Sequence, residues 1–220
     1  MCGRFALAAG IDRYAEWFGV EEIRAEPLPP SWNVAPTDPV YGIAEIDGRR
    51  MLGSFRWGLL PHWEERVGSG HINARAETLM EKPAFRKAAM TRRILIPADG
   101  FYEWRRRDGT RTAHHIAFGD GSPMAFAGIW SGWHSPEGER LVTCAIVTGN
   151  PNPVVRPFHD RMPLALDPSV WDDWLDPAQI DPVAILDQLR TVPADNWVTW
   201  RVSDRVNSVR NNGADLVAPV

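Results

Sequence analysis

Apolar residues repeat at helical spacing in only a few short stretches of the chain. Residues 11–18 place four apolar side chains on one helical stripe, and Gly19 follows as a stop signal. A second helical stretch, residues 76–90, is interrupted at Pro83. Two more helices are expected near residues 168–175 and 182–190. Helices therefore account for a small part of the chain.

Most other apolar runs are typical of β-strands. They occupy residues 40–46, 51–60, 93–104, 114–118, 124–130, 141–149 and 197–202, with an Asp47-Gly48 turn between the first two. The prolines of residues 26–39 exclude a regular helix and predict a structured loop. Strands with inserted helices, without regular β-α-β alternation, favour an α+β fold with mainly antiparallel sheet. No repeat or flexible linker divides residues 1–220, so we expect one domain.

Composition places the chain among ordinary globular proteins and limits its partners. Its 220 residues are 44% hydrophobic and 24% charged, enough to bury one large core. The formal net charge of −4 excludes a broadly basic protein, so any anion site must be a local cluster. All but two of the 24 basic residues are arginines. Arginine-biased codon usage and bidentate recognition of phosphate or carboxylate both explain this excess.

The tryptophans and cysteines indicate which residues form the core and which kinds of site the chain can contain. Four of the 11 tryptophans, Trp57, Trp104, Trp130 and Trp133, lie in strand-like runs and are predicted to be core residues. Two cysteines, Cys2 and Cys144, cannot form a dense disulfide framework, and no CxxC or HxxxH spacing indicates a metal site. The N-terminus lacks the charged segment and long apolar run of a signal peptide, and no stretch approaches the roughly 20 apolar residues of a membrane span. We expect a cytoplasmic protein without metal or cofactor.

Cys2 carries the most distinctive chemistry, because removal of Met1 would leave an amine and a thiol on adjacent carbons. An α-amine has a pKa of about 7.7–8.0 and is partly unprotonated at neutral pH. It can condense with an aldehyde to a Schiff base, which the thiol closes to a five-membered thiazolidine. The thiol could instead attack an amide carbonyl. Cys2 could also be simply a small buried residue.

Three other segments contain candidate catalytic side chains. Alternation along residues 99–104 places Phe101 and Glu103 on one face of a strand, where desolvation would raise the pKa of Glu103; pairing with a neighbouring arginine is the alternative. His159 has a side chain suited to proton transfer, although it could be an ordinary hydrogen-bonded loop residue. Asn73 and Arg75 would share one face of an extended strand and suit a phosphate or sugar oxygen; a turn residue and a solvated arginine are the alternative.

Five ordered motifs together resemble the SRAP family, the SOS response-associated peptidase domain. They are MCGRFA at residues 1–6, WNVAP at 32–36, INARAET at 72–78, DGFYEW at 99–104 and HDRMP at 159–163, and residues 206–220 resemble the family's closing segment. The resemblance implies curved, mainly antiparallel sheets that form a barrel-like core with short peripheral helices. It also implies a monomer, associated with the nucleoid when bound to damage, that binds single-stranded DNA and crosslinks to abasic sites.

The resemblance also implies roles for individual residues. Cys2 would form the thiazolidine, Asn73 would orient its amine, and Glu103 and His159 would transfer protons. The residues expected to contact DNA or line its pocket are Arg4, Asn33, Pro36, Trp63, Arg75, Thr148 and Arg161. The same pocket would remove the residue that precedes Cys2. A single tryptophan, Trp63, stands between His62 and Glu64, so fewer rings are available for stacking and DNA affinity could be weaker.

Two other classes of protein remain as alternatives. Amidohydrolases with an N-terminal nucleophile also begin Met-Cys-Gly, but they need an Asn-Gly oxyanion element, and the only such pair here is Asn212-Gly213. A noncatalytic module would bind DNA through arginines and tryptophans alone. Glutaminase activity would support the first, and DNA binding that never becomes covalent would support the second.

Overall fold

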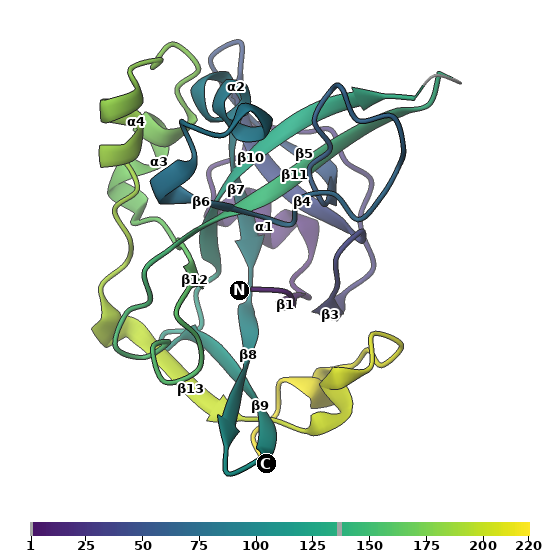
Figure 1. The fold of residues 1–220 in the computed structure, drawn as a ribbon, viewed down its shortest axis with the longest axis vertical. Helices are drawn as coiled ribbons and strands as arrows, with labels where there is room; N and C mark the ends of the chain where they lie inside the picture. The colour runs from purple at the N-terminus through teal and green to yellow at the C-terminus, as the bar shows by residue number, and fades with distance from the viewer. Residues whose placement is uncertain (1, 136–137) are drawn as a thin grey trace.

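A closed five-stranded β-barrel forms the centre of the molecule (Figure 1). The computed structural model describes residues 2–135 and 138–220. Around the barrel the strands are β11 (Arg140–Gly149), β10 (Met124–His134), β7 (Arg93–Ala98), β4 (Pro39–Ile46) and β5 (Arg49–Trp57). Neighbours are antiparallel, except that β5 and β11 pair in parallel and close the barrel. The expected barrel-like core is confirmed.

A second, wholly antiparallel sheet lies at one end of the barrel. Its strands, in order, are β13 (Trp197–Arg201), β9 (Thr110–Phe118), β8 (Gly100–Arg107), β1 (Phe5–Leu7) and β3 (Ser31–Val34). In Figure 1, β8 continues from β7 and extends out of the barrel. The short N-terminal strand β1 pairs with β8 on one side and β3 on the other. The start of the chain is therefore held inside a sheet.

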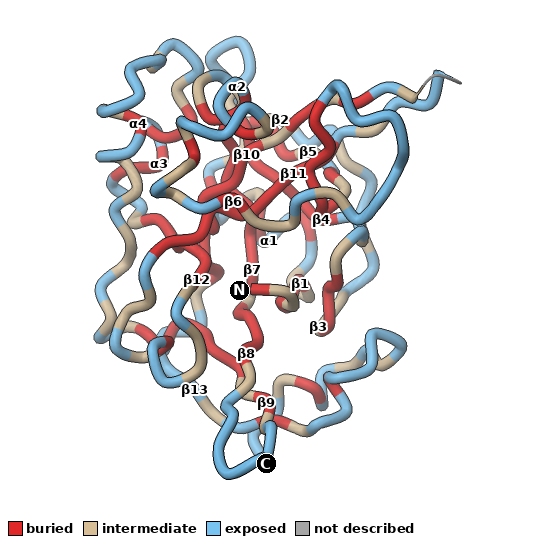
Figure 2. The backbone as a smooth tube through the Cα atoms, in the orientation of Figure 1, coloured by how far each residue is buried: buried red, intermediate tan, exposed pale blue. Residues whose placement is uncertain are grey.

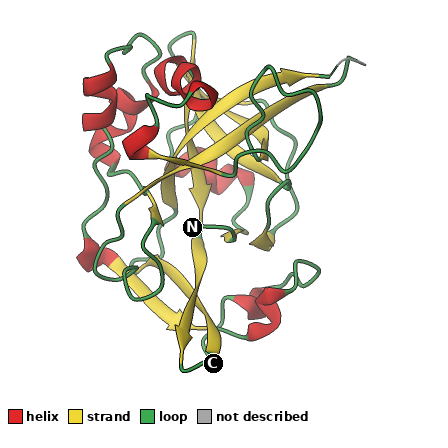
Figure 3. Cartoon of the chain, viewed as in Figure 1, coloured by secondary structure: helices red, strands yellow, loops and turns green. Residues whose placement is uncertain are grey.

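Short elements cover the barrel and its edges (Figure 3). Three strands extend the barrel sheet: β2 (Glu22–Ile23), β6 (Asn73–Arg75) and β12 (Met162–Pro163). The helices are α1 (Ile11–Trp17), α2 (Pro83–Thr91), α3 (Trp171–Leu175) and α4 (Pro182–Asp187). Single 3-10 turns are η1 (Ala76–Thr78), η2 (Pro168–Val170), η3 (Ala194–Asn196), η4 (Asp204–Asn207) and η5 (Ala214–Leu216). No helix in the described part of the chain could cross a membrane.

The two sheets share one core, and their strands are buried along much of their length (Figure 2). Phe5 of β1 makes edge contacts with Trp57, at 5.0 Å between ring centroids, and with Phe126, at 6.1 Å. Phe101 of β8 makes a similar contact with Phe126. These rings are fully buried and their edge-to-face geometry is favourable. They therefore anchor β1 and β8 to the interior of the barrel.

Most elements occur where the sequence predicts them, with four differences. Helix α2 begins at Pro83, because proline is tolerated in the first turn of a helix and the missing N–H costs nothing there. The predicted loop 26–39 contains β3, which is stabilised by pairing with β1. The single strand expected over 93–104 is two strands in different sheets. Trp57 and Trp133 are core residues, whereas Trp104 and Trp130 are only partly buried.

The division between β7 and β8 falls at a corner formed by Asp99 and Gly100. The Asp99 carboxylate accepts hydrogen bonds from the backbone N–H groups of Ala8 and Ala9 and from the Tyr14 hydroxyl. Gly100 has φ +147°, and a Cβ there would lie 2.4 Å from Cε1 of His115. Only glycine fits this combination of dihedral angle and close approach.

We predict that Gly100→Ala lowers the free energy of unfolding by about 3 kcal/mol, because it adds backbone strain and a clash with buried His115. Gly132→Ala is the control, since a Cβ at Gly132 meets no atom within 4 Å; its effect should stay within about 0.5 kcal/mol. Urea unfolding of both variants measures the difference. Equal effects would contradict this account of the corner.

Candidate functional site

Cys2 lies fully buried, three residues before the start of β1. The backbone N–H of Tyr102 donates to the carbonyl oxygen of Arg4 at 3.0 Å, so the pairing with β8 extends beyond Phe5 toward the N-terminus. Continuing this register brings Gly3 opposite Glu103. Burial raises the pKa of the Cys2 thiol, and the nearby charge of Glu103 acts in the same direction. The thiol therefore stays protonated until a base takes its proton. Met1 lies outside the described residues.

Glu103 is a buried carboxyl on β8. Its side chain shares a strand face with Phe101, as the alternation predicts, and the residue is 4% exposed. Burial raises the pKa of Glu103 above its ordinary value, although the charge of His159 partly opposes this shift. The predicted desolvation is confirmed. A carboxyl in this setting is suited to both giving and taking a proton.

Asn73 connects the barrel to Cys2. Strand β6 runs parallel to β11 with Asn73 level with Ile146, and its side-chain amide donates to the Cys2 carbonyl oxygen at 2.9 Å. The Asn73 side-chain oxygen is buried without a hydrogen-bond partner among the described residues. Arg75 lies two residues along the same strand and is exposed, whereas the intervening Ala74 is buried. The predicted shared face of Asn73 and Arg75 fits this pattern.

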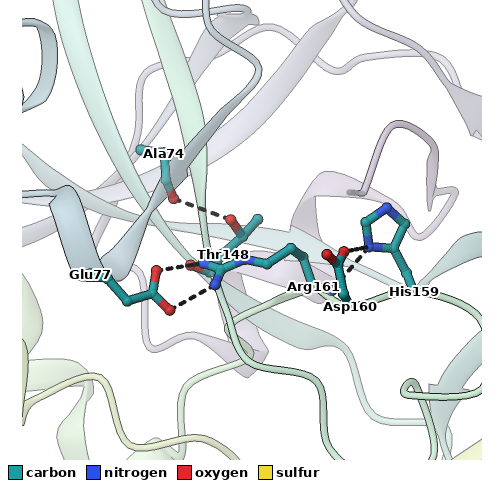
Figure 4. Close-up of polar contacts among 6 residues, drawn as sticks. All are labelled: Ala74, Glu77, Thr148, His159, Asp160 and Arg161. Carbon is teal, nitrogen blue, oxygen red and sulfur yellow. Dashed lines mark hydrogen bonds and ion pairs between the residues drawn. The ribbon is translucent and has the colours of Figure 1, made fainter.

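His159 lies in the turn between β11 and β12 and lines a cavity of about 520 Å³ with Glu103 and Arg4. Its Nδ1 atom lies 2.7 Å from a carboxylate oxygen of Asp160 and accepts a hydrogen bond from the backbone N–H of Arg161 at 3.0 Å (Figure 4). The Nδ1 atom of His159 is thus engaged by the two residues that follow it in the same turn. The arrangement holds the imidazole beside the cavity.

Three side chains of the β8–β9 hairpin line the cavity although they were not predicted as site residues. Trp104, predicted to be core, lines the cavity together with Arg106 and Arg111 of the β8–β9 hairpin. The Arg111 guanidinium lies 4.6 Å from the Trp104 ring centroid, a cation–π contact, and the indole N–H donates to Asn207. The sequence does carry a signal for this hairpin, because residues 105–107 are all arginine and an Asp108-Gly109 turn follows them. It predicts a hairpin with a basic edge.

Arg4 and Asn33 hold the C-terminal segment against the site. The Arg4 guanidinium lines the cavity and donates to the Asn33 side-chain oxygen at 2.7 Å and to the carbonyl of Val206 at 2.9 Å. The Asn33 amide donates to the carbonyls of Val206, Ser208 and Asn211. Burial lowers the pKa of Arg4. Asn33, 4% exposed, is thus engaged in holding the chain together.

The other predicted DNA contacts lie outside the lining of this cavity. Pro36 is in the turn after β3. Trp63 is 52% exposed and lines a separate hollow of about 340 Å³. Thr148 is fully buried, and its hydroxyl donates to the carbonyl of Ala74. Arg161 forms an ion pair with Glu77. The structure therefore brings Glu103, His159 and Arg4 together around one cavity, with Asn73 bonded to adjacent Cys2.

Metal and disulfide chemistry find no support in the parts of the chain that the structure describes. Within residues 2–135 and 138–220, no group of three or more His, Cys, Asp or Glu side chains could hold a metal ion. Cys2 and Cys144 are both free and buried. The available groups are a thiol, a carboxyl, an amide, an imidazole and several guanidinium groups.

Comparisons with known proteins match the chain to one family model, to characterised relatives and to a solved structure of the same fold. The family model described as SOS response associated peptidase (SRAP) matches residues 1–209. The chain is 41% identical to the abasic site processing protein YoqW of Bacillus subtilis over 221 residues, 99% of each chain. It is 30% identical to the abasic site processing protein YedK of Escherichia coli, with complete coverage of both. A crystal structure from Bacteroides thetaiotaomicron shares the fold over both full chains, with TM-score 0.88 and 23% identity.

We predict that Glu103→Gln stabilises the protein more at pH 7 than at pH 4. Above about pH 4.3 the Glu103 carboxyl loses its proton in the unfolded chain, whereas the folded protein holds that proton more tightly. The free energy of unfolding of the wild type therefore falls as pH rises, until the pH passes the raised pKa of Glu103. Glutamine mimics the protonated carboxyl and removes this loss. Urea unfolding at both pH values measures the effect. A stability difference that does not change with pH would contradict the raised pKa.

Proposed function

The chain belongs to the SOS response-associated peptidase family, and we propose that it captures abasic sites in single-stranded DNA as a covalent adduct of Cys2. The observation that carries the proposal is the placement of Cys2, whose carbonyl is held by Asn73 beside a cavity lined by Glu103 and His159. Removal of Met1 would give this residue a free amine next to its thiol. Such a pair reacts with aldehydes.

Glu103 is suited to open the sugar. An abasic deoxyribose is mostly a closed hemiacetal, so one proton must leave the C1′ hydroxyl and another must reach the ring oxygen before the aldehyde appears. A single buried carboxyl can both give and take a proton, because burial moves its pKa from the ordinary value toward neutral pH.

Covalent capture then proceeds in two bond-forming steps. The Cys2 amine attacks C1′ to give a carbinolamine, which loses water to form an iminium, with His159 assisting the departure of that water. The thiol adds to the iminium carbon and gives up its proton, for which Glu103 is the nearby base. Amine, thiol and aldehyde become a thiazolidine and one water. Asn73 orients the residue throughout.

Ring closure accounts for protection of the strand. An open aldehyde makes the neighbouring C2′ proton acidic, and its loss expels the 3′ phosphate. The thiazolidine has neither the aldehyde nor the iminium, so this elimination stops. A stable adduct is thus the expected product.

Local positive charge supports a DNA strand along the cavity. Arg4, Arg106 and Arg111 line it, and exposed Arg75 follows Asn73 on β6. With a net charge of −4, the protein would rely on these contacts and not on a wide basic face. Binding should therefore weaken steeply as salt rises. Trp104 offers an indole at the same cavity for base stacking.

Removal of Met1 would use the same groups. The Cys2 thiol, with Glu103 or Asn73 assisting, could attack the carbonyl of the preceding residue, which would break the amide, release the α-amine and leave the acyl group on sulfur as a thioester. Water would then hydrolyse the thioester, so that the preceding residue departs as a free acid and the thiol is restored for capture. The name of the family includes a peptidase, and this step would be one. The physiological form would then begin at Cys2.

The amidohydrolase alternative fits the geometry less well. The side chain of Asn212, in the one Asn-Gly pair of the sequence, donates to the carbonyl of Pro30 and accepts from the backbone N–H of Trp32. Asn212 is absent from the lining of the Glu103 cavity. An oxyanion element at this pair would need to leave both partners.

We predict a covalent band on a denaturing gel when purified protein meets an oligonucleotide with one abasic site. Cys2→Ala should give no stable band, because its amine can form a Schiff base but no ring. Glu103→Gln and His159→Ala should form the adduct at least ten-fold more slowly, because acid–base catalysis by one side chain typically contributes about 10²–10⁴-fold. Incubation with intact oligonucleotide is the control.

Equal bands from all four proteins would overturn the assigned roles. Ammonia release from glutamine by the wild type would favour the amidohydrolase, and binding without any adduct would favour a noncatalytic module.

A further inference from the structure

A carboxylate lies near the proposed DNA path, where its negative charge would repel phosphate. Glu77 follows exposed Arg75 by two residues, at η1, and pairs with Arg161. We propose that Glu77 is a positioning residue, which holds Arg161 so that the turn carrying His159 stays locked against the strand carrying Asn73. This inference rests on the proposed function and adds a residue to its machinery.

The ion pair is bidentate and well defined. Both guanidinium nitrogens Nη1 and Nη2 of Arg161 donate to the two Glu77 carboxylate oxygens, each at 2.7 Å. The Arg161 side chain is 12% exposed, whereas that of Glu77 is 48% exposed. The hydrogen bonds from Arg161 lower the pKa of Glu77. Paired, planar geometry of this kind fixes orientation as well as distance.

Arg161 carries this constraint from η1 to strand β11 (Figure 4). Its Nη2 also donates to the carbonyl of Thr148 at 2.6 Å, on β11. Thr148 is level with Arg75 in the β6–β11 pairing, and its hydroxyl bonds to Ala74. The backbone N–H of Arg161 donates to Nδ1 of His159. The side chain of Arg161, a residue of the histidine turn, thus ties that turn to η1, which follows β6, and to β11.

The alternative roles of Glu77 predict effects of opposite sign. A carboxylate that merely faced the DNA would repel phosphate, so Glu77→Gln would strengthen binding and leave the chemistry intact or faster. A positioning residue leaves affinity unchanged or improved, yet its loss slows capture because the imidazole is no longer held in place. Even a small displacement of a catalytic group lowers the reaction rate strongly. Separate measurement of affinity and rate therefore decides between them.

The experiment compares full-length wild type, Glu77→Gln, Arg161→Gln and the double variant, with Glu81→Gln as the matched control. Glu81 is an exposed carboxylate with no ion pair among the described residues. Rates of adduct formation are measured at saturating abasic oligonucleotide, and affinities with an intact oligonucleotide of the same sequence. We expect Glu77→Gln to slow capture about ten-fold without weaker binding, and Glu81→Gln to match wild type. The double variant should be no slower than Arg161→Gln.

Hydrogen exchange of the Arg161 amide, followed by NMR, tests the lock without DNA. In Glu77→Gln this amide should exchange at least ten-fold faster, while amides of β10 keep their wild-type rates. Wild-type capture by Glu77→Gln, weaker binding in proportion to rate, or faster exchange throughout the barrel would each overturn the inference. If wild type forms no adduct, the proposed function fails, and the local exchange result still decides the role of Glu77.

Discussion

The pairing of β1 with β8 is the constraint on which the site depends. It holds the first residues of the chain, which would otherwise fray, against the strand that carries Glu103. Burying a carboxyl beside a thiol costs free energy, and the aromatic contacts of Phe5 and Phe101 offset part of that cost. A reactive terminus is kept rigid because its neighbours are core residues.

The remaining groups come to the site from parts of the barrel that are distant in sequence. Asn73 arrives through the parallel pairing of β6 with β11, and His159 through the turn that follows β11. The C-terminal segment returns to Arg4 through Asn33. Closure of the barrel by β5 and β11 fixes these approaches relative to each other. The site is therefore a property of the topology and not of one local motif.

Local pattern was sufficient for most elements and for the burial of Glu103, because alternation and turn residues act over a few positions. It was insufficient where tertiary contacts decide. The corner at Asp99 depends on Tyr14 and His115, and β3 depends on β1. Ordered motifs identified Asn73 and His159 as candidates, but the contact of Arg111 with Trp104 and the Glu77–Arg161 pair are set by the tertiary fold. Neither pairing leaves a signature at a fixed sequence spacing.

Mass spectrometry of the N-terminal peptide, after incubation with an abasic oligonucleotide and nuclease digestion, tests most directly whether both functional groups of Cys2 bond to one sugar carbon. The account predicts a peptide that begins at Cys2 and carries the sugar remnant minus one water. Its thiol should resist iodoacetamide, and its mass should be unchanged by borohydride. A peptide whose thiol is alkylated, or whose mass rises by two hydrogens, would reveal an open Schiff base and contradict the ring.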